Sequence, residues 1–244
     1  MKNKPFEFRY RAGVIALIYV AGFAWSAFDH RSVASWVAEQ WNRTRGPLGP
    51  TSISHEAQAV LAAGTALVVA AAILRSWGTA YLKSDVVFDT NLRSERVVAD
   101  GPYRFVRNPL YFGSMLLAAG LGALASPWGW VIIFVGNLAF HYRLIMLEEP
   151  QLLHDQGERY RVYCQAVPRF WPALRPRLPA SGARPQWGQA LRGELFIWLF
   201  AAAILAQALT GRSRLASVLM DAAVVVYVID RIANRLGRRQ ATGA

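Results

Sequence analysis

Two polar segments of this chain combine residue types that bind and orient small charged molecules. The first, residues 101–113, reads GPYRFVRNPLYFG, and the second, residues 148–172, reads EEPQLLHDQGERYRVYCQAVPRFWP. Both are punctuated by Gly and Pro, and an uncharged run from Pro109 to Tyr142 lies between them. We expect this run to fold as an apolar hairpin that brings the two segments together at one membrane surface.

The Asn108-Pro109 pair predicts that a helix starts inside the first segment. Proline holds Asn108 outside helical geometry, so the helix begins at Pro109 with first-turn amides that have no partner within the helix. Such a terminus attracts an anionic group. Asn108 is either a plain N-cap or a cap that also contacts a ligand, and its position alone favours the plain cap.

Glu148 and Glu149 place two carboxylates next to each other after the apolar hairpin. Neighbouring side chains on a helix point about 100° apart, so these two cannot face the same partner. Either they form a solvated acidic pair, or one binds a cationic or amino group while the other pairs with arginine. Acids at a helix C-terminus oppose the macrodipole, which favours the second interpretation. The available partners are Arg143, Arg159 and Arg169.

Other titratable residues give weaker signals. His141, near the end of the hairpin, is interpreted as a packed or interfacial residue rather than a base. The single cysteine, Cys164, excludes an internal disulfide and a multi-cysteine metal site. No set of His, Cys, Asp and Glu has metal-ligand spacing, and the sequence contains no GxGxxG, P-loop or nucleophile elbow. We therefore expect no metal.

Composition indicates that membrane helices position the two segments. The chain has 244 residues, of which 54% are hydrophobic and 17% charged, and a helix needs about 20 residues to cross roughly 30 Å of hydrocarbon. Five apolar runs approach or meet that length, at 12–28, 57–74, 109–142, 195–211 and, interrupted by Asp221, 215–229. The third run fits two crossings, because Ser126-Pro127 supplies a turn. We predict an all-α integral membrane protein with about six transmembrane helices.

The runs also predict where the helices and their connections lie. The helices are expected near 12–28, 57–77, 110–125, 128–147, 194–210 and 214–230. Ser54 is the N-cap candidate of the second helix, after a loop, Asp29–Glu56, in which an amphipathic part lies flat at the interface. Small residues such as Gly64 allow this helix to pack closely in lipid. Gly78–Asp100 is expected to form a brief hairpin or an extended loop, and Gln151–Gln165 an amphipathic helix.

We divide the chain into N-terminal helices (1–76), a core with both segments (77–178) and C-terminal helices with a basic tail (179–244).

The formal net charge of +12 comes from cations that flank the apolar runs rather than from one basic domain. This pattern sets membrane orientation and argues against nucleic-acid binding. If the N-terminus lies inside, 22 of the 27 Lys and Arg residues lie on the cytoplasmic side. Both termini and both polar segments are then cytoplasmic. The short loops suit a prokaryotic inner membrane.

The two segments resemble the paired signatures of the isoprenylcysteine carboxyl methyltransferases and phospholipid methyltransferases. The first is similar to a signature written around Arg-His-Pro-x-Tyr-x-Gly. The second is similar to its companion through Glu148, Glu149, Gly157, Tyr160, Tyr163 and the sequence VPRFWP at 167–172. The resemblance covers about residues 77–172 and includes the apolar hairpin between the signatures.

The resemblance implies a membrane-embedded, S-adenosylmethionine-dependent methyltransferase that acts on a lipophilic or lipidated acceptor. Both signatures would form its cytosolic cofactor pocket. The positions that match cofactor contacts are Tyr103, Asn108, Pro109, Leu110, Tyr111 and Glu149. The positions expected to take part in catalysis or to meet substrate are Arg143, Glu148 and Arg169.

Asn108 departs from the carboxyl methyltransferases, which have His at this position. Asn donates and accepts hydrogen bonds but does not titrate, and it is similar to the residue of some phospholipid N-methyltransferases. The favoured reaction is carboxyl O-methylation of an isoprenylcysteine-like acceptor, with phospholipid N-methylation as the alternative. Two further alternatives are an NADPH-dependent enzyme like the membrane sterol reductases, which the sequence YCQAVP at 163–168 resembles, and a non-catalytic membrane scaffold.

Overall fold

The computed structural model describes residues 6–45, 54–87, 99–211 and 213–242, and within these ranges it contains helices and no strand. The expected all-α fold is confirmed. In chain order the elements are α1 (Phe6–Ala24), the 3-10 helix η1 (Trp25–Ala27), α2 (Val33–Arg45), α3 (His55–Val87), the 3-10 helix η2 (Gly101–Arg104), α4 (Pro109–Leu121), α5 (Pro127–Gln156), α6 (Glu158–Ala166), α7 (Trp187–Gly193), α8 (Leu195–Thr210) and α9 (Ser213–Thr242).

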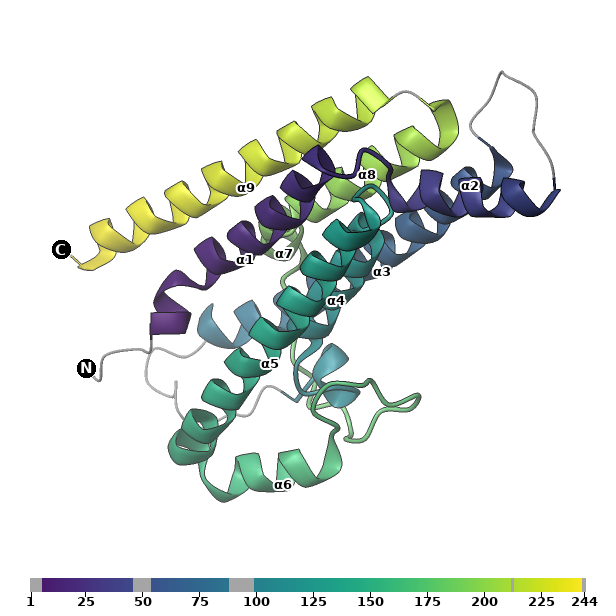
Figure 1. Ribbon diagram of the computed structural model, residues 1–244. Helices are drawn as coiled ribbons and strands as arrows, with labels where there is room; N and C mark the ends of the chain where they lie inside the picture. The colour runs from purple at the N-terminus through teal and green to yellow at the C-terminus, as the bar shows by residue number, and fades with distance from the viewer. Residues whose placement is uncertain (1–5, 46–53, 88–98, 212, 243–244) are drawn as a thin grey trace.

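The long helix α3 lies at the centre of the bundle. It packs against α2, α4, α7 and α8, while α1 packs against α5 and α9 packs against α8. Figure 1 shows the long helices running roughly alongside one another, with α2 at one end and α6 across the other. We call the end that carries η2, the start of α4 and α6 the motif end, because both polar segments lie there (Figure 1).

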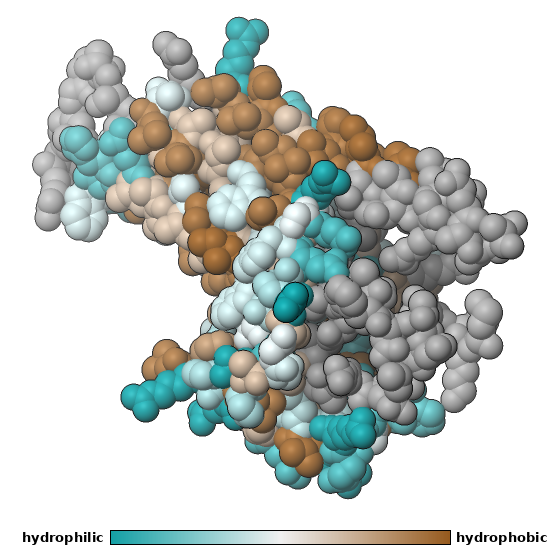
Figure 2. All heavy atoms as spheres, turned by 180° about the vertical axis from the view of Figure 1, so that it is seen from behind, coloured by the Kyte–Doolittle hydropathy of each residue, from teal (hydrophilic) through white to brown (hydrophobic). Residues whose placement is uncertain are grey.

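Within the described ranges, three helices are long and apolar enough to cross a membrane, namely α1, α3 and α5. The pair α7 and α8, bent by 59°, makes a fourth if it counts as one span. Figure 2 shows hydrophobic surface over much of the upper part of the molecule and hydrophilic surface gathered toward its lower end. The chain is therefore an integral membrane protein. The expectation of six spans stays a prediction, because α4 has only 13 residues and α9 is not among the helices that are long and apolar enough to span.

Close approach of α3 and α4 depends on two glycines that face each other. A Cβ on Gly64 would lie 2.8 Å from the carbonyl oxygen of Gly120, and a Cβ on Gly120 would lie 2.6 Å from that of Gly64. Neither backbone has room for a side chain here. The predicted use of small residues for close packing of α3 is confirmed at this crossing.

Two of the expected helix starts are confirmed by their caps. The side chain of Ser54 accepts a hydrogen bond from the amide of Ala57 at 3.3 Å, and that of Ser126 accepts one from Gly129 at 3.2 Å. Ser126 thus ends the tight turn of the apolar hairpin and begins α5, as the Ser-Pro pair predicted.

Several expected boundaries are wrong. The hairpin or loop predicted from Gly78 does not form up to Val87, because α3 continues through this stretch. Gly78 does not end the helix but faces α4, where a Cβ on it would lie 3.0 Å from Cδ2 of Leu110. Residues 88–98 of that prediction lie outside the described residues. The third expected helix ends at Leu121, and the fourth continues to Gln156. Gly157, at φ +58°, divides the expected amphipathic helix between α5 and α6.

A buried ion pair joins α3 to the bend between α7 and α8. Arg75 donates to both carboxylate oxygens of Glu194, at 2.9 and 3.2 Å, and the hydroxyl of Thr79 donates to the same carboxylate at 2.8 Å. The other guanidinium nitrogen donates to the carbonyl of Leu110 and to the hydroxyl of Ser114, at 3.0 and 2.7 Å. One side chain therefore links α3, the first turns of α4 and the start of α8.

Gly113 makes room for this link. A Cβ at this position would lie 2.5 Å from Cγ of Arg75. The glycine of the first segment thus lets the arginine pass close to α4 on its way to Glu194.

Arg75→Leu tests the strength of this link, because it leaves the carboxylate of Glu194 buried without its cation. Loss of one member of a buried pair typically costs about 3–5 kcal/mol, whereas apolar replacement of both members costs far less. We expect thermal unfolding in detergent to shift further down for Arg75→Leu than for Arg75→Leu/Glu194→Leu. A double variant that is as unstable as the sum of both single variants would contradict direct coupling.

Candidate functional site

The two polar segments lie side by side at the motif end, as predicted from the hairpin. One backbone hydrogen bond of 2.9 Å joins them, from Arg107 to Pro168. Two more of 2.9 Å join the residues just after the second segment to the first, from Ala173 to Phe105 and from Arg177 to Arg104. These bonds fix the register of one irregular segment against the other. Backbone segments about 70 positions apart in sequence are therefore hydrogen-bonded to each other next to the start of α4.

Asn108 is the N-cap residue of α4, but its side chain does not cap the helix. Its amide nitrogen donates instead to the carbonyl oxygen of Arg169, at 2.9 Å. The plain-cap interpretation is therefore wrong, because the side chain reaches across to the second segment. Sequence position alone shows where a helix starts but not which distant carbonyl competes for the side chain.

Glu149 lies between two arginines that come from different segments. Arg169 contacts one of its carboxylate oxygens at 2.8 and 2.9 Å, and Nη1 of Arg107 lies 3.0 Å from the other. The Arg107 and Glu149 side chains are 11% and 12% exposed, so water screens this pair weakly. The hydrogen bond to Glu149 raises the pKa of Arg169, which stays charged. We call Arg107, Glu149 and Arg169 the Glu149 cluster.

The Glu149 cluster confirms that one glutamate pairs with arginine, and it confirms Arg169 as a partner. Arg107 was missed, although it directly precedes Asn108 in the first segment. The available signal was charge complementarity between two segments that were expected to meet. The first segment carries two arginines and no acidic residue, whereas the second carries Glu148 and Glu149. Arg107 also donates to the sulfur of Cys164 at 2.8 Å.

Glu148 points to a different set of partners. It hydrogen-bonds with the hydroxyl of Tyr111 on α4, and Arg11 of α1 contacts the same hydroxyl. The two adjacent glutamates therefore do not share a partner, as their helical spacing predicted. Tyr111 and Glu148, both expected site residues, lie in direct contact. Arg11 was not predicted, because it lies outside both segments.

The remaining predicted residues have separate positions. Tyr103 is buried in η2, where its carbonyl oxygen accepts from the hydroxyl of Tyr163 at 2.9 Å. Pro109 is the buried first residue of α4, and the carbonyl of Leu110 accepts from Arg75. Arg143 lies on an exposed face of α5, where it pairs with Glu7 of α1 rather than with either glutamate of the second segment.

His141 is buried on α5, which agrees with the packed interpretation. Its Nδ1 lies 2.7 Å from the carbonyl oxygen of Asn137, and its ring contacts that of Tyr111 edge to face at 5.3 Å between centroids. A carbonyl oxygen only accepts, so the neutral imidazole carries its hydrogen on Nδ1. The ring thereby supports the position of Tyr111.

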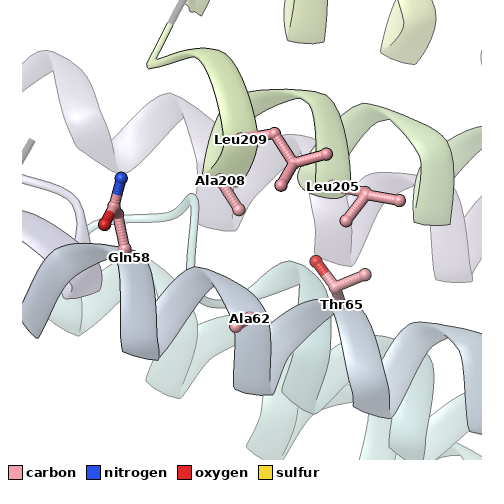
Figure 3. Close-up of a pocket in the computed structure, with 6 residues that line it drawn as sticks. All are labelled: Gln58, Ala62, Thr65, Leu205, Ala208 and Leu209. Atoms are coloured by element: carbon pink, nitrogen blue, oxygen red, sulfur yellow. The ribbon is translucent and has the colours of Figure 1, made fainter. Parts of the chain in front are cut away.

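A groove of about 330 Å³ lies elsewhere in the bundle. Figure 3 shows its lining side chains on the first turns of α3 and the last turns of α8. Its members are Gln58, Ala62, Thr65, Leu205, Ala208 and Leu209. None of them belongs to the polar segments. Among the described residues, no group of three or more His, Cys, Asp and Glu is placed to hold a metal ion.

Asp100 lies just before the first segment and binds Ser181 and Ala183, which follow the second segment in the chain. Its carboxylate accepts hydrogen bonds from the amide and hydroxyl of Ser181 and from the amide of Ala183, at 2.6 to 3.1 Å. Burial raises the pKa of Asp100, but these hydrogen bonds and the charge of Arg104 outweigh it, so the pKa lies below its ordinary value. The charged form is therefore favoured in the folded protein.

Asp100→Asn is expected to destabilise the protein at neutral pH, because the amide cannot accept from all three donors. Hydrogen bonds to a charged group contribute about 1.5–3 kcal/mol each. Because the pKa of Asp100 is lower in the folded than in the unfolded protein, its ionised form stabilises the fold at pH values above the ordinary Asp pKa of about 3.9. This stabilisation is lost as the pH falls below that value. Unfolding of both proteins between pH 7 and pH 3 should show their difference shrinking at low pH. A difference in stability between the two proteins that stays the same from pH 7 to pH 3 would contradict the role of the ionised Asp100 carboxylate.

Asn108→Ala is expected to loosen the two segments without unfolding the bundle. One hydrogen bond contributes about 1 kcal/mol net, so amide hydrogen exchange should become several-fold faster at Arg107 and Ala173. Asn108→His keeps a donor and should retain protection, while Gln151→Ala, on the exposed face of α5, is the matched control. Unchanged exchange in Asn108→Ala would show that the Arg169 contact does not hold the segments.

Part of the chain is similar in sequence to known proteins. Residues 59–158 match the phospholipid methyltransferase family. The nickel-cobalt-cadmium resistance protein NccN of Alcaligenes xylosoxydans xylosoxydans is 28% identical over 116 residues, or 48% of this chain and 51% of NccN. The cobalt-zinc-cadmium resistance protein CzcN of Cupriavidus metallidurans is 25% identical over 115 residues, or 47% and 50%. No solved structure gives a significant match.

The extent of these matches defines what they identify. The chain spans about half the length of the curated relatives that it matches. The family match includes the first segment and both adjacent glutamates and ends before Arg169. Residues 59–158 match the phospholipid methyltransferase family, which lies within the group of isoprenylcysteine carboxyl methyltransferases and phospholipid methyltransferases that the two segments resemble.

Proposed function

We propose that the protein is a membrane-embedded methyltransferase that uses S-adenosylmethionine and acts on a lipophilic acceptor. The observation that carries this proposal is the Glu149 cluster, in which both family signatures supply charged side chains to one buried junction. The family match supports a membrane methyltransferase. The positive-inside pattern supports a cytoplasmic motif end.

The junction has polar atoms that suit such a cofactor. Nε of Arg107 and Oε1 of Glu149 are buried and make no hydrogen bond, although Nη1 of Arg107 lies 3.0 Å from that carboxylate oxygen. Buried polar atoms are nearly always satisfied. S-adenosylmethionine carries an amino group that fits the carboxylate oxygen and a carboxylate that fits the guanidinium. The first turn of α4 adds amides that favour an anionic group.

Bound S-adenosylmethionine would supply an electrophilic methyl group on a sulfonium. The chain's own residues would then align the acceptor and exclude water, which accounts for much of the rate in such transfers. The rings of Phe112 and Phe170, which directly follow Tyr111 and Arg169 in sequence, meet edge to face at 5.7 Å between centroids. Tyr111 and Glu148 form the polar wall on the side of α1 and α5.

The charge pattern favours an amine acceptor. A carboxylate acceptor needs an arginine to hold it, yet Arg107 and Arg169 pair with Glu149, and Arg143 pairs with Glu7. An amine must lose a proton before it attacks the methyl group. Glu148 would accept that proton, because Arg107 and Arg169 pair with the other glutamate and leave this carboxylate beside Tyr111. We therefore place phospholipid N-methylation first.

Carboxyl O-methylation of an isoprenylcysteine-like acceptor is the second candidate. It is supported by Arg169, whose side chain is 38% exposed, so some of its donors remain accessible to an incoming carboxylate. Labelled methyl transfer to vesicles of phosphatidylethanolamine, compared with transfer to a farnesylcysteine analogue, separates the two candidates. The first acceptor is expected to be labelled, and labelling of the second alone would reverse the order.

Calorimetric titration of S-adenosylhomocysteine into detergent-purified protein tests the cofactor proposal. We expect binding that weakens at least about tenfold in Glu149→Gln, a loss of about 1.4 kcal/mol, because the neutral amide forms no ion pair with the ligand's amino group or with either arginine. The matched control is Glu158→Gln, whose side chain is 72% exposed. Folded wild-type protein that binds no S-adenosylhomocysteine would refute the proposal and direct attention to NADPH and then to a scaffold role.

A further inference from the structure

The segment after α6 exposes apolar side chains in a fixed position. Trp171 and Leu174 are 74% and 101% exposed, although residues on either side are hydrogen-bonded to the first segment. We call residues 171–177, WPALRPR, the tip. Figure 1 shows the segment between α6 and α7 projecting sideways from the bundle, and Figure 2 shows hydrophobic and hydrophilic surface together on a projection at the same level.

The tip is held rigidly rather than left loose. The amides of Ala173 and Arg177 bind the carbonyls of Phe105 and Arg104, both at 2.9 Å, and the Arg104 side chain donates to the carbonyl of Leu178 at 2.7 Å. The backbone on both sides of Leu174 is therefore tied to the first segment, and the Leu174 side chain lies on the exposed side. Leaving such side chains in water costs free energy at about 25 cal/mol per Å² of apolar surface, which indicates a partner that covers them.

Contacts of the tip lie where the uncharged run of residues 109–142 begins and ends. The ring of Trp171 lies 5.8 Å from that of Phe112 and 5.6 Å from that of Phe170. Phe112 is in the first turn of α4, where the uncharged run that begins at Pro109 starts. At the other end of that run, Arg169 hydrogen-bonds with Tyr142. Trp171 thus lies at the level where charged residues give way to membrane-spanning ones.

The composition of the tip suits a lipid headgroup layer. Tryptophan is enriched at the interface between membrane and water, and arginines near the surface attract anionic lipids by about 1 kcal/mol each. Arg175 and Arg177 are both exposed beside Leu174. We propose that the tip inserts Trp171 and Leu174 into the headgroup region of the membrane leaflet at the motif end, with its arginines on anionic lipid phosphates.

This surface would also hold lipid next to the candidate site. Phe112, which Trp171 contacts, directly follows Tyr111, and Arg169 of the Glu149 cluster lies two residues before Trp171. The inference goes beyond the proposed function and does not depend on it. It would stand if the protein bound no S-adenosylmethionine.

Spin-label accessibility tests the insertion directly. Leu174→Cys and, as a control, Glu158→Cys on exposed α6 are labelled in a Cys164→Ser background and reconstituted with phosphatidylglycerol-containing lipid. We expect the label at 174 to collide several-fold more with oxygen, relative to a water-soluble nickel complex, than the label at 158. Arg175→Gln/Arg177→Gln, or purely zwitterionic lipid, should reduce this difference.

Equal nickel access at both positions would overturn the proposal, because the tip would face water. Shielding of position 174 from both reagents would also overturn it and indicate a protein partner, including a second copy. If Cys164→Ser fails to fold, wild-type protein reconstituted with a photoactivatable phosphatidylglycerol replaces it. Cross-links should then map to residues 171–177 and not to α6, and the reverse pattern would contradict insertion.

Discussion

The ion pairs of Glu149 hold together the two segments on which the rest of the motif end depends. A carboxylate that loses most of its contact with water carries a large desolvation penalty, which two guanidinium groups offset only when the geometry is good. Arg169 hydrogen-bonds to the carboxylate from one segment and Arg107 approaches it to 3.0 Å from the other, so both cations reach the charge only when the segments lie together. The backbone bonds from Arg107 to Pro168 and from Ala173 to Phe105 then follow.

A second buried pair makes the bundle a suitable base for this junction. Arg75 and Glu194 tie the first turns of α4 to the central helix α3 and to the start of α8, and the absent side chain at Gly113 lets the arginine pass. Glu194 lies outside the family match, at the bend between α7 and α8. The C-terminal helices therefore stabilise the position of a helix start that belongs to the family segment.

Rules that act between neighbouring residues predicted much of this structure, but they did not predict contacts between residues far apart in sequence. The caps at Ser54 and Ser126, the start of α4 at Pro109 and the divergence of Glu148 from Glu149 follow from rules that act within one or two helical turns. The bond from Asn108 to Arg169, and the roles of Arg11 and Arg107, depend on residues brought together only by folding. Gly78 was taken as a helix stop because a close approach to α4 leaves no local signal.

An experimental structure of the protein in a lipid nanodisc with S-adenosylhomocysteine tests the central claim most directly. The account predicts that the ligand lies against the first turn of α4, within hydrogen-bonding distance of Glu149 and Arg107, with both polar segments closed around it. A ligand bound elsewhere, for example in the groove between α3 and α8, or segments that separate on binding, would contradict it.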